Sequence, residues 1–380
     1  AQKRLLRGGA NGANASARGS SAMAEARVDI GSATLYQGDC FEIMHEMEGD
    51  SIDLIATDPP YFKVKNEAWD RQWNSADEFV AWMRRLCETW REMLKSNGSL
   101  YCFASPQMAA RVEVEMSSHF NVLNRIVWIK SEGRHKGCHK ESLRAYFPQT
   151  EFIVFAEHYG ADNMAKGEAG YVLKCDKLRG FVFEPLRAYL DGERRRAGVS
   201  KMECNVACGF SACAGGMAGH YFGSSQFCIP TPEHYTELQR LFNAKCNGSG
   251  PQYLRREYED LRREYEDLRR EYEDLRRPFS VSADIAFTDV WNFPVVRNYR
   301  GKHPCEKPLL MMRHIISVSS RDGATVFDPF MGSGTTGVAA VQLGRKFIGI
   351  EREPKYFERA CNRVREALES PSQLELVAHG

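Results

Sequence analysis

The chain has 380 residues, of which 43% are hydrophobic and 27% are charged, as in a globular protein with a large core. Its formal net charge of +1 excludes a uniformly basic surface, so any basic surface for nucleic acid must be local. No apolar run is long enough to span a bilayer, and the basic N-terminus lacks the apolar segment of a secretory signal.

Residues 1–27 are predicted to be a disordered leader, because most of them are Gly, Ala, Ser, Asn or basic. The 12 cysteines follow no framework spacing, which indicates free thiols in a reducing cytoplasm. Cys204, Cys208, Cys213 and His220 form an alternative zinc set, but their spacing does not repeat a CxxC pair. We therefore predict no metal.

The first half of the chain alternates predicted strands and helices. Strands are expected at residues 33–37, 52–57, 99–103, 125–130 and 150–155. Helices are expected at about 40–47, 76–95 and 106–118. The second of these helices is predicted from apolar residues at helical spacing, namely Phe79, Val80, Met83, Leu86, Trp90 and Leu94.

Asp58-Pro59-Pro60-Tyr61 directly follows the expected strand at 52–57. Two prolines cannot continue a central strand, so the chain must leave the sheet at its carboxyl edge, where open α/β sheets bind ligands. The Asp58 carboxylate and the Pro59 carbonyl can accept both protons of a nucleobase amino group, and Tyr61 offers a face for stacking. A plain strand end with a surface Asp is the alternative interpretation.

Residues 157–290 break the alternation and are predicted to be an insertion. Within it, Pro230-Thr231-Pro232-Glu233 predicts the start of a helix that runs to Phe242. The insertion is interpreted either as a helix-turn-helix type DNA reader or as a lid or dimer domain with a solvated basic face.

An internal repeat lies near the end of this insertion. The sequence Arg-Glu-Tyr-Glu-Asp-Leu-Arg starts at Arg256, Arg263 and Arg270, and it predicts a helix over 254–277 with a Tyr/Leu heptad seam. Such a short helix is marginal alone, so the seam should pack on something. A spacer helix lying on its own domain and a coiled coil with a partner are both open.

The end of the chain resumes the alternation. A strand at 324–327, a helix to 343, a strand at 346–350 and a helix at 354–368 complete the set. Seven strands interleaved with helices predict a doubly wound, mostly parallel α/β sheet. Between the first strand and helix lies Gly332-Ser333-Gly334-Thr335-Thr336-Gly337, which by itself would suggest a nicotinamide oxidoreductase.

The motifs together resemble the beta class of S-adenosylmethionine-dependent DNA amino-methyltransferases. The resemblance covers about 28–156 and 286–368, and it rests on the order of the Asp58 tetrapeptide, a central variable region, His303-Pro304-Cys305-Glu306-Lys307-Pro308 and Asp328-Pro329-Phe330 with its glycine loop. It implies a permuted, Rossmann-like seven-stranded core in two halves, 28–156 and 286–370. The target-recognition insertion is then 157–285, and 371–380 is a tail.

The resemblance implies methyl transfer from S-adenosylmethionine to adenine N6 in a flipped-out base of double-stranded DNA, by a cytoplasmic homodimer. Asp rather than Ser at position 58 favours adenine over cytosine N4. The implied catalytic residues are Asp58, Pro59, Pro60 and Tyr61. The implied cofactor residues are Asp39 for the adenine, Glu351 for the ribose, and Asp58, Lys307, Asp328, Phe330, Gly332, Ser333, Gly334, Thr335 and Thr336.

Basic and polar residues in three regions are predicted to bind DNA. They are Arg134, Lys136, Lys140, Arg144, Arg194, Arg195, Arg196, Ser224, Gln226, Arg297 and Arg300. A DNA-binding protein with an inactive core is a further alternative, against which the intact Asp58 and glycine motifs argue. RNA and protein substrates are disfavoured by the motif order and the large insertion.

Overall fold

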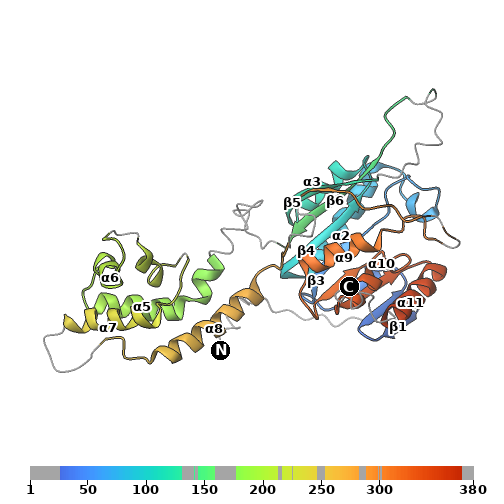
Figure 1. The fold of residues 1–380 in the computed structure, drawn as a ribbon. Coiled ribbons are helices and arrows are strands. Elements are labelled where there is room, and N and C mark those ends of the chain that lie inside the picture. The colour runs from blue at the N-terminus through green and yellow to red at the C-terminus, as the bar shows by residue number, and fades with distance from the viewer. Residues whose placement is uncertain are drawn as a thin grey trace, which may run out of the picture.

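The computed structural model describes residues 26–130, 141, 144–158, 177–212, 216–224, 226–245, 253–281, 288–297, 299 and 302–369. Within these residues the chain forms a large mixed sheet covered by helices, and a separate cluster of helices that the long helix α8 connects to it (Figure 1). None of the helices in the described part of the chain is both long and apolar enough to cross a membrane.

The sheet has the strand order β1-β2-β9-β8-β3-β4-β6-β5-β7. The strands are β1 (Ala26–Ile30), β2 (Ala33–Gln37), β3 (Ile52–Thr57), β4 (Leu94–Ala104), β5 (Asn121–Ile129), β6 (Thr150–Glu157), β7 (Val290–Trp291), β8 (Thr325–Asp328) and β9 (Lys346–Glu351). From β2 to β4 all neighbours pair in parallel, whereas β6 is antiparallel to both β4 and β5. The expected α/β architecture is therefore present.

The described residues hold nine strands rather than the expected seven, and the two additional strands lie at the edges of the sheet. β1 forms a hairpin with β2 through Gly31, whose φ of 56° suits a tight turn. Its apolar residues alternate with exposed Arg27 and Asp29, a short pattern of a half-buried strand that was not among the expected strands. β7 is only two residues long and pairs with β5 at Val127 and Trp128, too short to leave a periodic pattern.

Helices cover both faces of the sheet. α1 (Cys40–His45), α2 (Ala76–Met93) and α3 (Ala109–Ser117) pack on one face around Trp90 and Phe79, which are fully buried. α9 (Leu309–Ser319), α10 (Thr335–Gln342) and α11 (Pro354–Glu369) pack on the other face. Because helices cover both faces, the side chains of a central strand are buried on both sides of the sheet. The sequence of such a strand is therefore a near-continuous apolar run, as in β3.

The insertion forms its own apolar core. Its elements are α5 (Glu184–Arg196), α6 (Lys201–Ala207), η4 (Met217–Tyr221), α7 (Pro232–Ala244) and α8 (Tyr258–Leu275). Helix α7 begins where the sequence predicted, with Thr231 accepting a hydrogen bond from the His234 amide and Pro232 in the first turn. We call these elements the helical cluster.

The heptad repeat forms α8, and its seam packs on the helical cluster. Leu261 and Tyr272 are buried, and the ring of Tyr265 lies 5.3 Å from that of Phe183. The Tyr258 hydroxyl donates to the Pro230 carbonyl at 2.9 Å. Of the two interpretations of the seam, the structure thus shows the helix lying on its own domain.

The C-terminal end of α8 is fixed to the sheet. Arg277 forms a 2.8 Å ion pair with Glu157, and both side chains are buried. Asn121 donates to the other oxygen of the Glu157 carboxylate at 2.9 Å, so both oxygens of this buried carboxylate accept a hydrogen bond. Arg321 donates to main-chain carbonyls at the end of α8, including that of Arg276 at 2.8 Å. The helix is therefore anchored at both ends.

Glu157 ends β6, a strand that runs antiparallel to β4. The helical cluster therefore joins the sheet at the end opposite to the carboxyl ends of β3 and β4 (Figure 1). Asp58, which follows β3, lies at the other end.

The packed seam predicts how deletions within α8 affect stability. Removing seven residues, Arg263 to Arg269, rotates the remainder of the helix by only about 20° and keeps the Tyr/Leu stripe intact. Removing five residues, Arg263 to Asp267, turns the rest of the stripe by about 140°. The buried Tyr272 would then leave the helical cluster, a loss of about 3 kcal/mol.

We therefore expect the five-residue deletion to lower the melting temperature more than the seven-residue deletion. Differential scanning calorimetry of both variants beside the parent protein measures this. If the shorter deletion were the milder one, α8 would act only as a spacer of a given length.

Candidate active site

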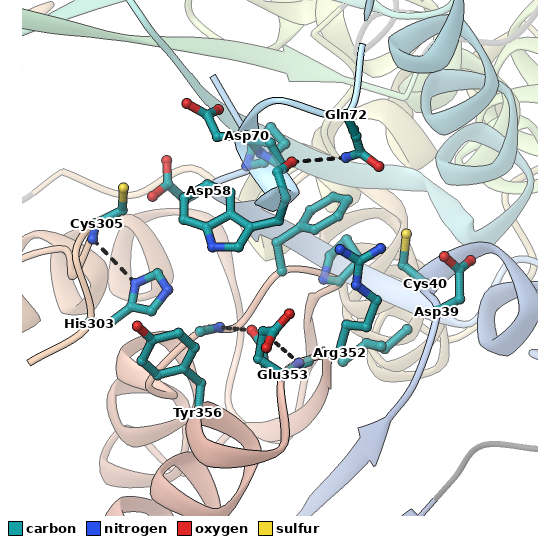
Figure 2. Close-up of a pocket in the computed structure, with 18 of the residues that line it drawn as sticks. Asp39, Cys40, Asp58, Asp70, Gln72, His303, Cys305, Arg352, Glu353 and Tyr356 are labelled. Atoms are coloured by element: carbon teal, nitrogen blue, oxygen red, sulfur yellow. Dashed lines mark hydrogen bonds between the residues drawn. The ribbon is translucent and has the colours of Figure 1, made fainter. Parts of the chain in front are cut away.

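The carboxyl ends of four adjacent parallel strands meet at one edge of the sheet. They bring together Asp58 after β3, Asp328 at the end of β8, Glu351 at the end of β9, and Asp39 just after β2. A cavity opens at this edge and is lined by Asp39, Asp58 and Glu351 and by Pro329, the neighbour of Asp328 (Figure 2). The topology of the sheet thus collects residues from the two distant halves of the chain.

The glycine loop between β8 and α10 borders this cavity. Gly332 and Gly334 have φ of 52° and 78°, a region that residues with a side chain rarely adopt. A Cβ on Gly334 would lie 2.8 Å from the Cβ of Ala360, so the loop also depends on close packing against α11. Two independent constraints therefore require glycine at position 334.

Glu351 holds the same loop from the neighbouring strand. One carboxylate oxygen accepts from the amide of Gly332 at 3.0 Å, and the other accepts from the amide of Glu353 at 2.8 Å. Burial raises the pKa of Glu351 to about 7. A carboxylate that lines the cavity and accepts only two amide hydrogen bonds has lone pairs left for further donors.

Asp328 is buried, and its carboxylate accepts hydrogen bonds from neighbouring residues of the site. It accepts from the hydroxyls of Thr57 at 2.8 Å and Thr336 at 2.6 Å, and from the amide of Phe330 at 3.1 Å. Burial raises its pKa to about 6. Asp328 therefore joins β3, β8 and α10 at the floor of the site.

Ser333 and Thr335 are held by a pair of charged residues. The Arg363 guanidinium donates to the Ser333 hydroxyl at 2.8 Å and to the Thr335 hydroxyl at 3.1 Å. Glu306 accepts from the Ser333 hydroxyl at 3.0 Å. A small cavity lined by Glu306, Ser333 and Thr335 continues from the glycine loop to Asp58. No local pattern in the sequence indicates Arg363, which contributes through the packing of α11.

Asp39 caps the N-terminus of α1, where its side chain accepts from the amide of Phe41 at 2.9 Å. The preceding Gly38 bonds through its amide to the Glu351 carbonyl at 3.1 Å, which fixes Asp39 and Glu351 on the same cavity wall. Asp39, Asp58, Phe330, Gly332 and Glu351, all expected to bind the cofactor, line this one cavity.

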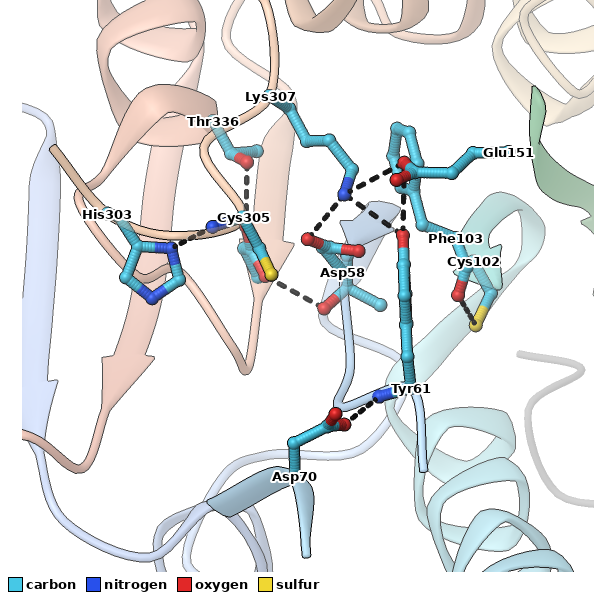
Figure 3. A network of polar contacts seen from close by, with 12 residues as sticks. Asp58, Tyr61, Asp70, Cys102, Phe103, Glu151, His303, Cys305, Lys307 and Thr336 are labelled. Atoms are coloured by element: carbon cyan, nitrogen blue, oxygen red, sulfur yellow. Dashed lines mark hydrogen bonds and ion pairs between the residues drawn. The ribbon is translucent and has the colours of Figure 1, made fainter. Parts of the chain in front are cut away.

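Asp58 presents its two carboxylate oxygens to different surroundings. Oδ2 accepts from the Nζ of Lys307 at 2.6 Å (Figure 3). Oδ1 is buried and accepts no hydrogen bond from any residue that the structure describes. Burial raises the pKa of Asp58, and the charge of Lys307 opposes this rise. A buried acceptor without a hydrogen-bond partner lowers the stability of a folded protein, so it indicates a position where a ligand donates a hydrogen bond.

Lys307 was expected among the cofactor residues, and the structure places its ammonium group against Asp58. Nζ also donates to the Tyr61 hydroxyl at 2.9 Å and lies 3.3 Å from Glu151. Burial alone would lower the pKa of Lys307, yet Asp58 and Glu151 raise it above its usual value. Sequence reasoning missed Glu151, although a carboxylate at the second position of the apolar strand β6 breaks the pattern of that strand.

The segment after Tyr61 folds back over the cavity because Asp70 holds it. Asp70 is fully buried and accepts from the amides of Tyr61 at 2.6 Å and Lys65 at 2.5 Å. The ring of Trp69 stacks on that of His303 at 6.2 Å. The sequence showed these residues only as a polar and aromatic loop, because its turn depends on one buried side chain.

A second cavity lies on the other side of Tyr61. It shares Tyr61, Lys65 and Cys305 with the first cavity. Its remaining wall includes Trp128, Lys130, Glu151, Lys307 and the segments at 147–149 and 295–296. Tyr61, Lys65 and Cys305 therefore lie between the first and the second cavity.

The predicted DNA-binding residues lie in different settings. Arg134, Lys136, Lys140 and Arg300 fall outside the described residues, whereas Arg144, Ser224, Gln226 and Arg297 are exposed. On α5, Arg194 is largely buried, with 13% of its side chain exposed, and pairs with Asp191. Arg195 and Arg196 are 73% and 54% exposed but pair with Asp191 and Glu193. The positive charge of this cluster is thus offset by its own helix.

Cys204 and Cys208, considered as zinc ligands, are buried in the apolar core of the helical cluster. Cys213 falls outside the described residues. Within the described residues no three His, Cys, Asp or Glu side chains form a group that could hold a metal ion.

Comparison with known proteins identifies the class to which this site belongs. A family profile described as DNA methylase, of the N6 and N4 amino-methyltransferase type, matches residues 52–362. This match spans most of the chain, and the chain therefore belongs to that family. It is a DNA methyltransferase with S-adenosylmethionine as methyl donor, which confirms the resemblance seen in the motifs.

Individual relatives are distant but match over nearly the whole chain. Type II methyltransferase M2.MboI of Moraxella bovis is 23% identical over 350 residues, 87% of each protein. DNA adenine methyltransferase YhdJ of Escherichia coli strain K12 is 24% identical over 341 residues, 87% of this chain and 82% of the relative. The solved M1.HpyAVI–SAM complex aligns with a TM-score of 0.46 at 19% identity, covering 87% of this chain and 98% of that one.

If the glycine loop shapes the cofactor site, two glycine substitutions should differ in their effect on cofactor affinity. Gly334→Ala should weaken binding of S-adenosylmethionine at least tenfold, because the new Cβ meets Ala360 and moves the cavity wall. Gly344→Ala is the matched control, since Gly344 has a φ of 71° but open space around its Cβ. Both variants should lose about 1 kcal/mol of stability from backbone strain.

Isothermal titration calorimetry with S-adenosylmethionine and thermal melting separate these two effects. Equal cofactor affinity in both variants would show that the loop does not shape the cofactor site.

Proposed function

We propose that this chain transfers a methyl group from S-adenosylmethionine to the N6 atom of adenine at specific sites in double-stranded DNA. The observation that carries the proposal is the buried Oδ1 of Asp58, an acceptor without a hydrogen-bond partner among the described residues. Asp58 lines both the first cavity and the small cavity beside Ser333. Relatives such as YhdJ, described as a DNA adenine methyltransferase, support the choice of adenine. Asp rather than Ser at position 58 favours it over cytosine N4, which remains the alternative.

The first cavity fits the adenosine part of the cofactor. Glu351 has lone pairs left for ribose hydroxyls, and Asp39 is placed on the same wall to accept from the adenine amino group. The smaller cavity beside Ser333, Thr335 and Thr336 fits the methionine part, near the N-terminus of α10, where a carboxylate is stabilised. When bound, the cofactor supplies an electrophilic methyl group.

The second cavity fits the target adenine. Asp58 does not line it, but Lys307, which contacts Asp58, does, and so does Tyr61, which borders both this cavity and the first one. A base inside a duplex cannot reach Asp58, so it must be rotated out of the helix before it enters this cavity. Tyr61 separates the two cavities and offers a stacking surface, while Trp128 lines the far wall. The catalytic set proposed here is Asp58, Pro59, Pro60 and Tyr61.

The chemical task of Asp58 follows from the electronic structure of the amino group. The nitrogen lone pair of adenine N6 is delocalised into the ring, so the group is a poor nucleophile. A hydrogen bond to Oδ1 of Asp58, and a second one to the Pro59 carbonyl, would draw the nitrogen towards tetrahedral geometry and free the lone pair. As the nitrogen gains the methyl group it loses one proton, for which Oδ1 is the adjacent acceptor.

The arrangement of the chain supports a permuted core. The segment that presents Asp58 precedes the glycine loop in sequence, although both lie at one edge of the sheet. We assign 28–156 and 286–370 as the catalytic and cofactor halves and 157–285 as the target-recognition insertion. A cytoplasmic homodimer remains the proposed form of the enzyme.

Removing the Asp58 carboxylate should separate chemistry from cofactor binding. In Asp58→Ala, we expect methylation of DNA to fall by about 10²–10⁴-fold, the usual contribution of a positioned proton acceptor. Binding of S-adenosylmethionine should stay within a few-fold of the parent value, because Asp39, Gly332 and Glu351 still line the cavity and the Asp58 carboxylate acts mainly on the target amino group. A methylation assay with a tritiated cofactor and calorimetry test both parts. Parent-level turnover in this variant would refute the assigned role of Asp58.

Two exposed basic pairs should differ in their contribution to DNA binding. Arg144 and Arg297 flank the segments that line the second cavity, whereas Arg195 and Arg196 lie on the helical cluster at the opposite end of the sheet. The double substitution Arg144→Ala with Arg297→Ala should reduce the salt dependence of the binding constant by ~0.9 for each phosphate that the variant no longer neutralises. The pair on α5 should change this slope less, because Asp191 and Glu193 already offset its charge.

Fluorescence anisotropy of labelled duplex DNA over a range of salt concentrations measures both slopes. A larger effect from the α5 pair would assign the main phosphate contacts to the helical cluster.

A further inference from the structure

Lys307 lies at the centre of the active site and contacts Asp58, the residue assigned to the reaction. Its ammonium group is buried, with 8% of the side chain exposed. It reaches Asp58 at 2.6 Å, the Tyr61 hydroxyl at 2.9 Å and Glu151 at 3.3 Å (Figure 3). A lysine ammonium has three N–H donors, and these three acceptors use all of them. None is left to bind the cofactor carboxylate.

Glu151 links Lys307 to a second cation. Its carboxylate pairs with Lys130 as well as Lys307, and the Tyr61 hydroxyl donates to it at 3.4 Å. Two carboxylates and two ammonium groups thus alternate in a row from the reaction centre towards the surface. The row is electrically neutral as long as Asp58 is ionised. The three segments that supply it are the turn after β3, the region of β5 and β6, and the chain before α9.

We propose that Lys307 is a positioning residue that fixes Oδ2 of Asp58, so that Oδ1 alone faces the target amino group as a charged acceptor, and that Glu151 tunes this charge. The inference rests on the proposed methyl transfer to an amino group. It assigns different roles to the two oxygens of Asp58: Oδ2 binds Lys307, and Oδ1 accepts from the target amino group.

The groups around Asp58 act in opposite directions. Burial and the charge of Glu151 raise the pKa of Asp58, whereas the charge of Lys307 lowers it. Other titratable groups near the pair come from every packed element and are Lys65, Tyr61, Cys102, Lys130, His303, Cys305, Glu306 and Asp328. Among the described residues, none of these groups forms an ion pair with the Asp58 carboxylate, whereas Lys307 does.

The acceptor works only when Asp58 has lost its proton, so the rate of methyl transfer should fall as the pH drops through the pKa of Asp58. Lys307→Met removes the group that lowers this pKa, and the acidic limb of the pH profile should move upward by ~1–3 units. Glu151→Gln removes a charge that raises it, and the limb should move downward by a smaller amount. The two variants should therefore shift in opposite directions.

The experiment measures single-turnover methylation of duplex DNA between pH 5 and pH 10, in the range where each variant stays folded, with saturating S-adenosylmethionine. Variants are Lys307→Met, Lys307→Arg and Glu151→Gln, and Lys346→Met is the control because Lys346 is an exposed residue on β9. Lys307→Arg keeps the charge but not the geometry, so its rate should fall while its acidic limb stays near the parent position. Calorimetry should give cofactor affinities within threefold of the parent for all four.

Opposite shifts in Lys307→Met and Glu151→Gln support the proposal. A uniform loss of rate at every pH in Lys307→Met, without a shift, would reduce Lys307 to a structural role and overturn it. A tenfold loss of cofactor affinity in Lys307→Met would return Lys307 to the cofactor carboxylate. If the parent enzyme instead methylated a position other than an amino group, the proposed function would fail first, a result visible from the methylated product before any variant is made.

Discussion

The structure depends on a buried carboxylate, that of Asp58, which has a hydrogen-bond partner at only one of its two oxygens among the described residues. Burying a carboxylate is costly unless a counter-charge accompanies it, and Asp58 has one in Lys307. Lys307 in turn needs Glu151, and Glu151 needs Lys130. This chain of requirements draws together segments that are far apart in sequence, and it leaves one buried oxygen of Asp58 without a hydrogen-bond partner among the described residues. In the proposed reaction, this oxygen is the acceptor for the target amino group.

The sheet makes this arrangement possible. Parallel pairing of β2, β9, β8 and β3 puts the ends of four strands side by side, and Asp328 connects two of them to α10 through the hydroxyls of Thr57 and Thr336. The glycine loop then closes against α11, where any side chain at Gly334 would meet Ala360. The first cavity and the row of charges around Lys307 thus lie at the same edge of the sheet. The helical cluster is attached at the opposite end, through Arg277 and Glu157.

The sequence predicted the parts of this site that depend on local patterns. Asp58, Gly332 and Glu351 follow or end strands with clear apolar runs, and the structure places all three on one cavity. The seven internal strands were predicted from their apolar residues, whereas the edge strand β1 is a short alternation and β7 is only two residues long. The start of α7 was predicted from its cap, and the heptad seam of α8 from its period.

Contacts between distant segments escaped prediction. The partners of Lys307 come from positions 58, 61 and 151, and nothing in their local sequence links them. The same holds for Asp70, which folds the loop after Tyr61, and for Arg363, which reaches Ser333 from the last helix. The basic run on α5 suggested a DNA surface because the sequence does not show that Asp191 pairs with two of its arginines.

Single-molecule sequencing of genomic DNA from cells that express the parent protein tests the central claim most directly, because it reports the modified base and its sequence context together. The Asp58-centred site predicts N6-methyladenine within one defined sequence motif and at no other base. N4-methylcytosine, or an unmodified genome with soluble and cofactor-binding protein present, would contradict it.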